Sequence, residues 1–136
     1  MANQFYPKAK KKILLGGINC ESDTLAAVLI KNTYAFNAAN EFLSDISAHV
    51  LGKVELENVQ VTVAGTGAVT VSADDLRFEG HEAGNTARAL VLIKDTGVPG
   101  TSSLIAFYDQ AVGLPVVLTA APQSFEWSAT DKVFSW

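Results

Sequence analysis

The sequence predicts a mostly β fold, an antiparallel β-sandwich or barrel-like domain with a short N-terminal helix and one further short helix. Apolar or alternating segments of about five to eight residues recur along the chain, which is typical of strands. Sequences rich in Gly, Asp and Asn separate these segments and predict turns. The length of 136 residues is that of one domain. We therefore expect a single β-rich domain over residues 1–136, with residues 1–17 as an N-terminal arm and helix.

Residues 5–15 predict the N-terminal helix. Pro7 suits the first turn, because its missing N–H would have no partner there. Residues four apart form an apolar stripe: Phe5, Ala9 and Ile13. Another face carries three lysines: Lys8, Lys11 and Lys12. Gly16 and Gly17 predict the end of the helix. We interpret the lysines as a solvated face, with contact to an acidic partner surface as the alternative.

The next segments predict two kinds of strand. Residues 24–31 are almost continuously apolar, which indicates a strand buried on both faces. Residues 37–47 predict a loop with a short helix that Asn37 would cap. Apolar and polar residues alternate over residues 53–63, but the phase of the alternation changes at residues 57–58. This change predicts a β-bulge or bend.

The second half predicts short strands around one long central strand. Two short alternating segments follow a glycine-containing turn: residues 69–71 and 76–78. The longest apolar run, residues 87–93, is the candidate central strand. A turn-rich segment separates it from a strand at residues 103–108, so we expect an antiparallel pair. Residues 116–118 are expected to be extended. Three apolar residues near the end predict a closing hairpin: Phe125, Trp127 and Val133.

Composition limits the classes of function. The net charge of −4 and the pI near 5.0 argue against a general nucleic-acid binder, which needs a basic surface. Only 18% of the residues are charged, so association with a partner meets less repulsion. No apolar run approaches the length of a membrane span, and the N-terminus does not resemble a secretory signal. We expect synthesis in a cytoplasm, with neither nucleic acid nor membrane as partner.

No catalytic motif is present, and we expect neither enzymatic activity nor a cofactor. A metal site from His81, Glu79 and Glu82 is conceivable, but alternating strand residues point to opposite faces. His49 is interpreted as a surface or loop residue. The pair at residues 74–75 is interpreted as a turn, with acid–base or calcium chemistry as the alternative. Cys20 is interpreted as a partly buried thiol; a nucleophile or an inter-chain disulfide is the alternative.

Several segments together carry a resemblance to a known family. They are NQFYPKAKKKILLGGI, SDTLAAVLI, EFLSDI, LVLIKDTG, SLIAFYD, GLPV and a terminal F-x-W-S…VFSW. The sequence resembles a family of small tailed-bacteriophage proteins that are encoded among head and tail structural genes. The shared segments are signatures of turns and strands, not catalytic motifs. The tract VVLTAAPQ after Pro115 is more apolar than in the family, where Asn-Gly residues are common.

The resemblance implies a virion structural protein. The preferred expectation is a capsid decoration (cement) protein on the capsid surface, made in the bacterial host cytoplasm, that bridges subunits of the major capsid protein. Contacts with other copies of itself, as a homo-oligomer such as a trimer, would suit this role. A head–tail connector or tail structural protein is the alternative.

We expect the contact residues at the chain ends and in the apolar loop: Phe5, Tyr6, Lys8, Lys11, Val116, Val117, Leu118 and Trp136. Trp136 would either pack into its own domain or dock onto a neighbour. A further alternative is a carbohydrate- or ligand-binding β-sandwich for host adsorption. It would need exposed aromatic side chains, for which Tyr34, Tyr108 and Trp127 are the candidates.

Overall fold

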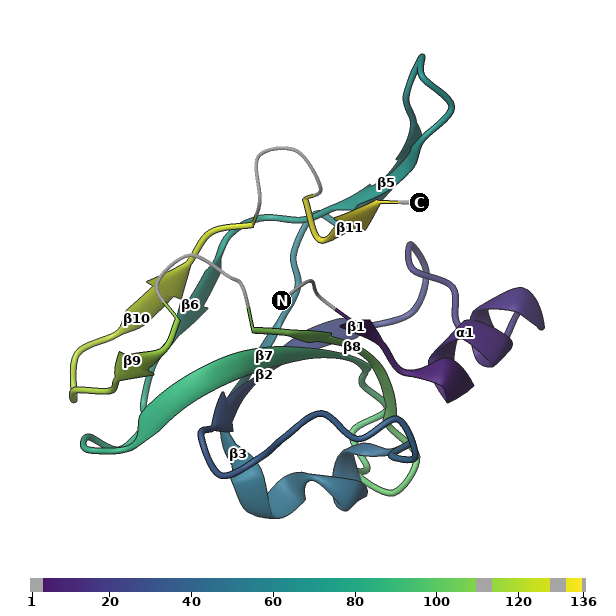
Figure 1. The fold of residues 1–136 in the computed structure, drawn as a ribbon. Coiled ribbons are helices and arrows are strands. Elements are labelled where there is room, and N and C mark those ends of the chain that lie inside the picture. The colour runs from purple at the N-terminus through teal and green to yellow at the C-terminus, as the bar shows by residue number, and fades with distance from the viewer. Residues whose placement is uncertain (1–3, 110–113, 128–131, 136) are drawn as a thin grey trace.

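The structure is a computed structural model that describes residues 4–109, 114–127 and 132–135. It confirms a mostly β fold with antiparallel sheets (Figure 1). The largest sheet has six strands, of which five follow the order β1-β8-β7-β2-β3, and β9 also pairs with β7. The bounds of these strands are Gln4–Phe5 (β1), Ser103–Tyr108 (β8), Thr86–Lys94 (β7), Leu25–Lys31 (β2), Val50–Glu55 (β3) and Val116–Val117 (β9).

Two smaller sheets accompany the large one. One has the order β11-β5-β4, with the bounds Phe134–Ser135 (β11), Val69–Ser72 (β5) and Gln60–Val63 (β4). The other pairs β10 (Gln123–Phe125) with β6 (Leu76–Phe78). β6 packs closely over the large sheet, because a Cβ at Gly52 in β3 would lie 3.4 Å from the ring of Phe78. Close packing between sheets is the feature that a sandwich requires.

The core lies on the central strands of the large sheet. The six residues 25–30 of β2 and the five residues 89–93 of β7 are all buried. β8 is buried along its whole length. Both apolar-run predictions are therefore confirmed, and so is the antiparallel pairing of β7 with β8. A side chain on either face of these strands meets another layer, which explains why their sequences do not alternate.

The N-terminal helix is shorter than predicted. α1 spans Pro7–Leu14, with Pro7 at its first position. Phe5 belongs to β1, which pairs with β8, so it is not part of a helical stripe. Ala9 is buried and Ile13 packs partly against the core, as the periodicity predicts. Gly16 has φ +79°, the left-handed conformation that ends a helix.

The second predicted helix is replaced by two short 3-10 turns, Leu43–Asp45 (η1) and Ser47–His49 (η2). Asn37 does not cap them, since its Oδ1 accepts the N–H of Ala39 in a local turn. The Asp45 carboxylate instead accepts the backbone N–H groups of Phe42 and Glu41, at 3.0 and 2.8 Å. The hydrogen bond from Phe42, followed by that from Glu41, lowers the pKa of Asp45.

The predicted bend at residues 57–58 is confirmed, with Asn58 at φ +55°. The alternative, a bulge within one strand, is wrong, because the chain leaves the large sheet there and enters another. The closing hairpin is also wrong, because β10 pairs with β6 whereas β11 pairs with β5. Each of these short C-terminal strands therefore joins an element far away in the sequence.

Candidate interaction surface

An apolar groove of roughly 320 Å³ lies between the end of α1 and the β4–β5 hairpin. One side consists of Ile13, Gly16, Ile18, Asn19 and Cys20. The other side consists of Val61, Val69 and Val71 from the hairpin and of Phe134 from β11. The groove is open to solvent and its lining is mostly apolar, which is the character of a surface that a binding partner covers.

The hairpin has one valine face and one polar face. Opposite residues on paired strands share a face, and the register pairs Val61 with Val71 and Val63 with Val69. The other face carries four polar residues: Gln60, Thr62, Thr70 and Ser72. Valine and threonine are both favoured in strands, so the alternation forms the hairpin while separating its two surfaces. The valine face borders the groove.

Exposed apolar side chains are found at both sides of the groove. Leu14 is 81% exposed and Leu15 is 74% exposed, and they lie between two lining residues in the sequence. Val63 is 73% exposed on the hairpin. No residue from 59 to 73 is charged. Clustered apolar exposure of this kind marks interaction sites in proteins.

Cys20 lines the same groove and is half-buried, as predicted. Burial, and then the negative charge of Asp23, raises the pKa of the Cys20 thiol. A thiol with a raised pKa is mostly protonated at neutral pH, and the protonated form is a poor nucleophile. The thiol therefore contributes to the groove as a small apolar group.

Two of the predicted contact residues are in the core. Tyr6 is fully buried and its hydroxyl lies 3.0 Å from that of Tyr34. Burial, followed by this hydrogen bond, raises the pKa of Tyr6. Leu118 is buried, and its backbone N–H and carbonyl bond to Asn85 and Gly84. Both residues are consequently corrected from contact residues to core residues, because the backbone of each bonds to a segment far away in the sequence, at Ile105 and Asn85.

The other predicted contact residues do not form one surface. Lys8 and Lys11 are exposed on α1, while Val117 is exposed on β9, and these two elements lie at opposite sides of the molecule (Figure 1). Phe5 and Val116 are half-buried. Trp136 lies outside the described residues.

The lysine face of α1 has an acidic partner within the chain. Lys12 and Lys8 lie 2.9 and 3.5 Å from the carboxylate of Glu41. The hydrogen bond from Lys12 is the largest cause that lowers the pKa of Glu41. Lys12 also lies 4.3 Å from the centre of the Phe42 ring, a cation–π contact. Intramolecular pairing of this kind leaves less positive charge for an acidic partner.

A second, polar pocket of about 280 Å³ contains His81, Glu82 and Lys31. Both ring nitrogens of His81 are buried without a protein partner. A pocket this size holds water, which can satisfy such nitrogens. The Glu79 carboxylate forms an ion pair with Arg77, with its Oε1 2.6 Å from Nε. No group of three metal-ligating side chains occurs among the described residues.

The structure does not support the ligand-binding interpretation of the aromatic residues. Tyr34 and Tyr108 are buried. Trp127 packs edge-on against Tyr108, and its Nε1 donates to the carbonyl of Asp74 at 3.0 Å. Asp75 accepts a long backbone hydrogen bond from Trp127, at 3.4 Å. The acidic pair lies in an irregular segment between β5 and β6 and not in the predicted turn, and its carboxylates accept hydrogen bonds from Asn58 and Trp127.

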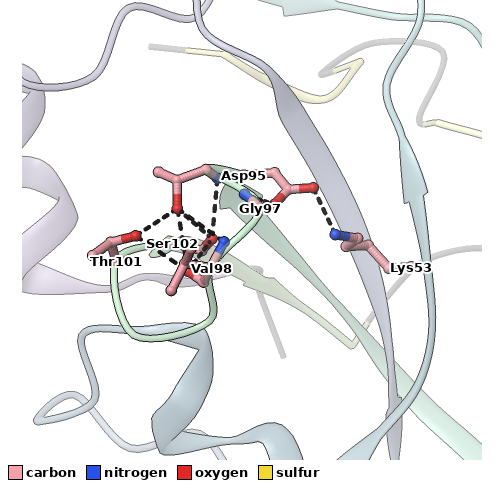
Figure 2. A network of polar contacts seen from close by, with 7 residues as sticks. Lys53, Asp95, Gly97, Val98, Thr101 and Ser102 are labelled. Atoms are coloured by element: carbon pink, nitrogen blue, oxygen red, sulfur yellow. Dashed lines mark hydrogen bonds and ion pairs between the residues drawn. The ribbon is translucent and has the colours of Figure 1, made fainter.

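The loop that joins β7 to β8, residues 95–102, is braced by hydrogen bonds among its own residues and by Lys53 of β3 (Figure 2). The Asp95 carboxylate accepts the Lys53 ammonium at 2.7 Å and the Gly97 N–H at 2.9 Å. Buried Ser102 donates to the Val98 carbonyl at 2.9 Å and accepts the N–H of Thr96. This loop therefore has a structural task, joining β7 to β8, and none of its groups converges on a reactive site.

Comparisons with known proteins identify no relative: no family model, no curated protein and no solved structure matches the chain. No helix in the described ranges is long and apolar enough to cross a membrane. Sequence reasoning missed the groove and its exposed residues. Two signals were available for it, the Leu14-Leu15 pair directly before two glycines and the uncharged stretch of residues 59–73.

Proposed function

We propose that this protein is a structural component of a tailed-phage virion, a capsid decoration protein that binds the outside of the head and bridges major capsid protein subunits. The resemblance to tailed-phage structural proteins provides the biological setting. The observation that carries a binding role is the apolar groove with Leu14, Leu15 and Val63 exposed beside it. Such a surface gains free energy when a protein partner removes it from water.

Binding without chemistry is sufficient for this role. Every copy of a decoration protein binds the same repeating site on the capsid surface, and attachment at several points raises the effective affinity. The central strands are buried on both faces within the chain itself, so the core of the fold does not depend on a partner. The groove is the part of the protein that we expect to lose exposure on the particle.

The copy number in purified particles tests the setting. Quantitative mass spectrometry would compare this protein with the major capsid protein. A copy number comparable to that of the major capsid protein supports decoration of the lattice. A much smaller number, typical of a single ring, would instead favour the connector or tail alternative. Absence from the particle overturns the virion proposal.

A binding assay tests the surface. Particles that lack the protein would be mixed with purified protein, and occupancy would be measured after sedimentation. Leu14→Glu and Leu15→Glu are expected to lower occupancy at least tenfold, because each places a charge on the apolar contact. Val98→Glu is the matched control, since Val98 is 57% exposed on the braced loop. Equal occupancy for all variants would show that the groove does not form the contact with the particle.

A further inference from the structure

The hairpin β4–β5 has a free edge. Its strands are joined by residues 64–68, where the Gly67 N–H donates to the Ala64 carbonyl and the Ala64 N–H donates to the Ala68 carbonyl. Gly67 has φ +91°, as a three-residue hairpin loop with a glycine bulge requires. In the described chain β5 is the only strand that pairs with β4. The hairpin projects from the rest of the molecule (Figure 1).

The turn determines which backbone groups point outward from this edge. Ala64 and Ala68 form a hydrogen-bonded pair, and hydrogen-bonded pairs alternate with non-hydrogen-bonded pairs along an antiparallel ladder. Thr62 with Thr70 is therefore the next bonded pair, and Val61 with Val71 is a non-bonded one. It follows that the N–H and C=O groups of Val61 and Val63 are directed away from β5.

This edge lacks the charged and proline residues that often prevent pairing between sheets. Natural edge strands carry lysine, proline or inward-pointing charges. β4 contains none of these, and no charge occurs in residues 59–73. Val63 also exposes most of its side chain. The edge consequently offers hydrogen bonds and apolar surface to a neighbouring strand, with no charge to oppose the approach.

We propose that β4 pairs antiparallel with β4 of a second copy of this chain, about a two-fold axis at Val61. In this register Val61 lies opposite its own equivalent, and Val59 lies opposite Val63. Val61 and Val63 direct their N–H and C=O groups outward, so the central Val61 pair can exchange both hydrogen bonds. The same register places valine against valine on one face and Gln60 against Thr62 on the other. A register shifted by one residue would place Val61 against Thr62 and mix the two faces.

Self-complementarity favours a second copy over an unrelated strand. An uncharged edge does not select a charged partner, whereas matching of the two faces is automatic when the strand meets itself in this register. The result is a six-stranded sheet made from two three-stranded sheets, with the valine faces on one side. This pairing gives a two-fold dimer and not a trimer, and it does not depend on the virion setting.

Disulfide trapping with purified protein tests the register. Residues opposite each other in a hydrogen-bonded antiparallel pair have Cα atoms about 5.5 Å apart, a separation that a disulfide spans. In a Cys20→Ser background, Val61→Cys is expected to form a covalent dimer under mild oxidation. Val63→Cys and the control Val98→Cys are expected to cross-link at least tenfold more slowly. Faster cross-linking at Val63 than at Val61 would overturn the pairing.

Sedimentation equilibrium without cross-linking tests the interface itself. The protein is expected to be a dimer that Val61→Pro and Val63→Lys each convert to a monomer, while the matched Val98→Lys remains a dimer. Proline is compatible with this position, because the Val61 N–H does not bond to β5. Circular dichroism would show that the variants remain folded. A monomer at all concentrations up to about 1 mM, or a trimer, overturns the proposal. Neither result bears on the particle-binding assay, so the two proposals are tested separately.

Discussion

The protein contains two hairpins of similar residue types in very different surroundings. The β7–β8 hairpin lies inside the large sheet, with β2 and β1 on its two outer edges and buried side chains on both faces. Within the described residues, the β4–β5 hairpin is paired on one edge, by β11, and leaves Val63 exposed. Apolar strand sequence is thus compatible with both core and surface.

The loops of the two hairpins differ in the number of side chains that hold them. The loop of β7–β8 is held by Lys53, Asp95 and Ser102 through hydrogen bonds and an ion pair. Within the described residues, the loop of β4–β5 is closed by the backbone hydrogen bonds around Gly67. We conclude that β7–β8 is built to hold the fold, whereas β4–β5 is available for an interaction.

The largest expected difference between the two hairpins is in the cost of truncating a side chain. Leu92→Ala, in the centre of β7, is expected to lower the free energy of unfolding by about 2 to 5 kcal/mol, because it leaves a cavity. Val63→Ala should change the free energy of unfolding by less than about 0.5 kcal/mol. Chemical denaturation below the dimerisation concentration measures both. A large cost at Val63 would show that its face is covered within the monomer.

The next effect concerns the carboxylate of the braced loop. The side chain of Asp95 is 6% exposed. Asp95→Asn is expected to cost about 1.5 to 3 kcal/mol at neutral pH, since its charged hydrogen bonds from Lys53 and Gly97 weaken. Urea denaturation provides the measurement. Asp75→Asn is the control, as its one contact with Trp127 is long. Equal losses for the two variants would refute a special role of the braced loop.

The same carboxylate predicts a pH dependence. Burial by itself would raise the pKa of Asp95, but the hydrogen bonds from Lys53 and Gly97 outweigh this, so the pKa of Asp95 is lowered. Its stabilisation is therefore complete above the unfolded-state pKa, near 4, and is lost as pH falls through the lower folded-state value. The difference in unfolding free energy between wild type and Asp95→Asn should shrink below about pH 4. A constant difference down to pH 2 would contradict this assignment.

A smaller effect is expected at Ser102. Ser102→Ala leaves the Thr96 N–H and the Val98 carbonyl with one partner fewer in a buried site, at a cost of about 1 to 2 kcal/mol. Thr101→Ala should cost less, because Thr101 is exposed and water can replace its hydroxyl. Thermal unfolding of the two variants makes the comparison. If Thr101→Ala were the more harmful change, the buried serine would not be the centre of the loop.

The smallest effect is expected in the turn of the other hairpin. Gly67→Ala should cost about 1 kcal/mol, because an alanine is strained at φ +91°. Gly65→Ala is the matched control, with no positive φ and with open space around its Cβ. The two free energies of unfolding, together with the dimer affinity, form the measurement. Equal values for the two alanine variants would argue against the proposed turn geometry.

Much of the fold could be predicted from the sequence. The apolar runs at residues 24–31 and 87–93 identified the central strands, because a strand buried on both faces has no polar positions to alternate. Pro7 and Gly16 marked the ends of α1 to within about two residues. The site was less predictable: Tyr6 and Leu118 were expected at the surface and are buried.

The sequence by itself determined the local conformations and the buried strands, since periodicity and turn residues act within a few positions along the chain. Only the tertiary structure decided that Gln60 starts a different sheet, that β10 and β11 pair in two different sheets, and which valines remain exposed. These outcomes depend on pairing between strands that are far apart in the sequence. A valine has the same intrinsic preference for a strand in both hairpins, and its exposure is set by what packs against it.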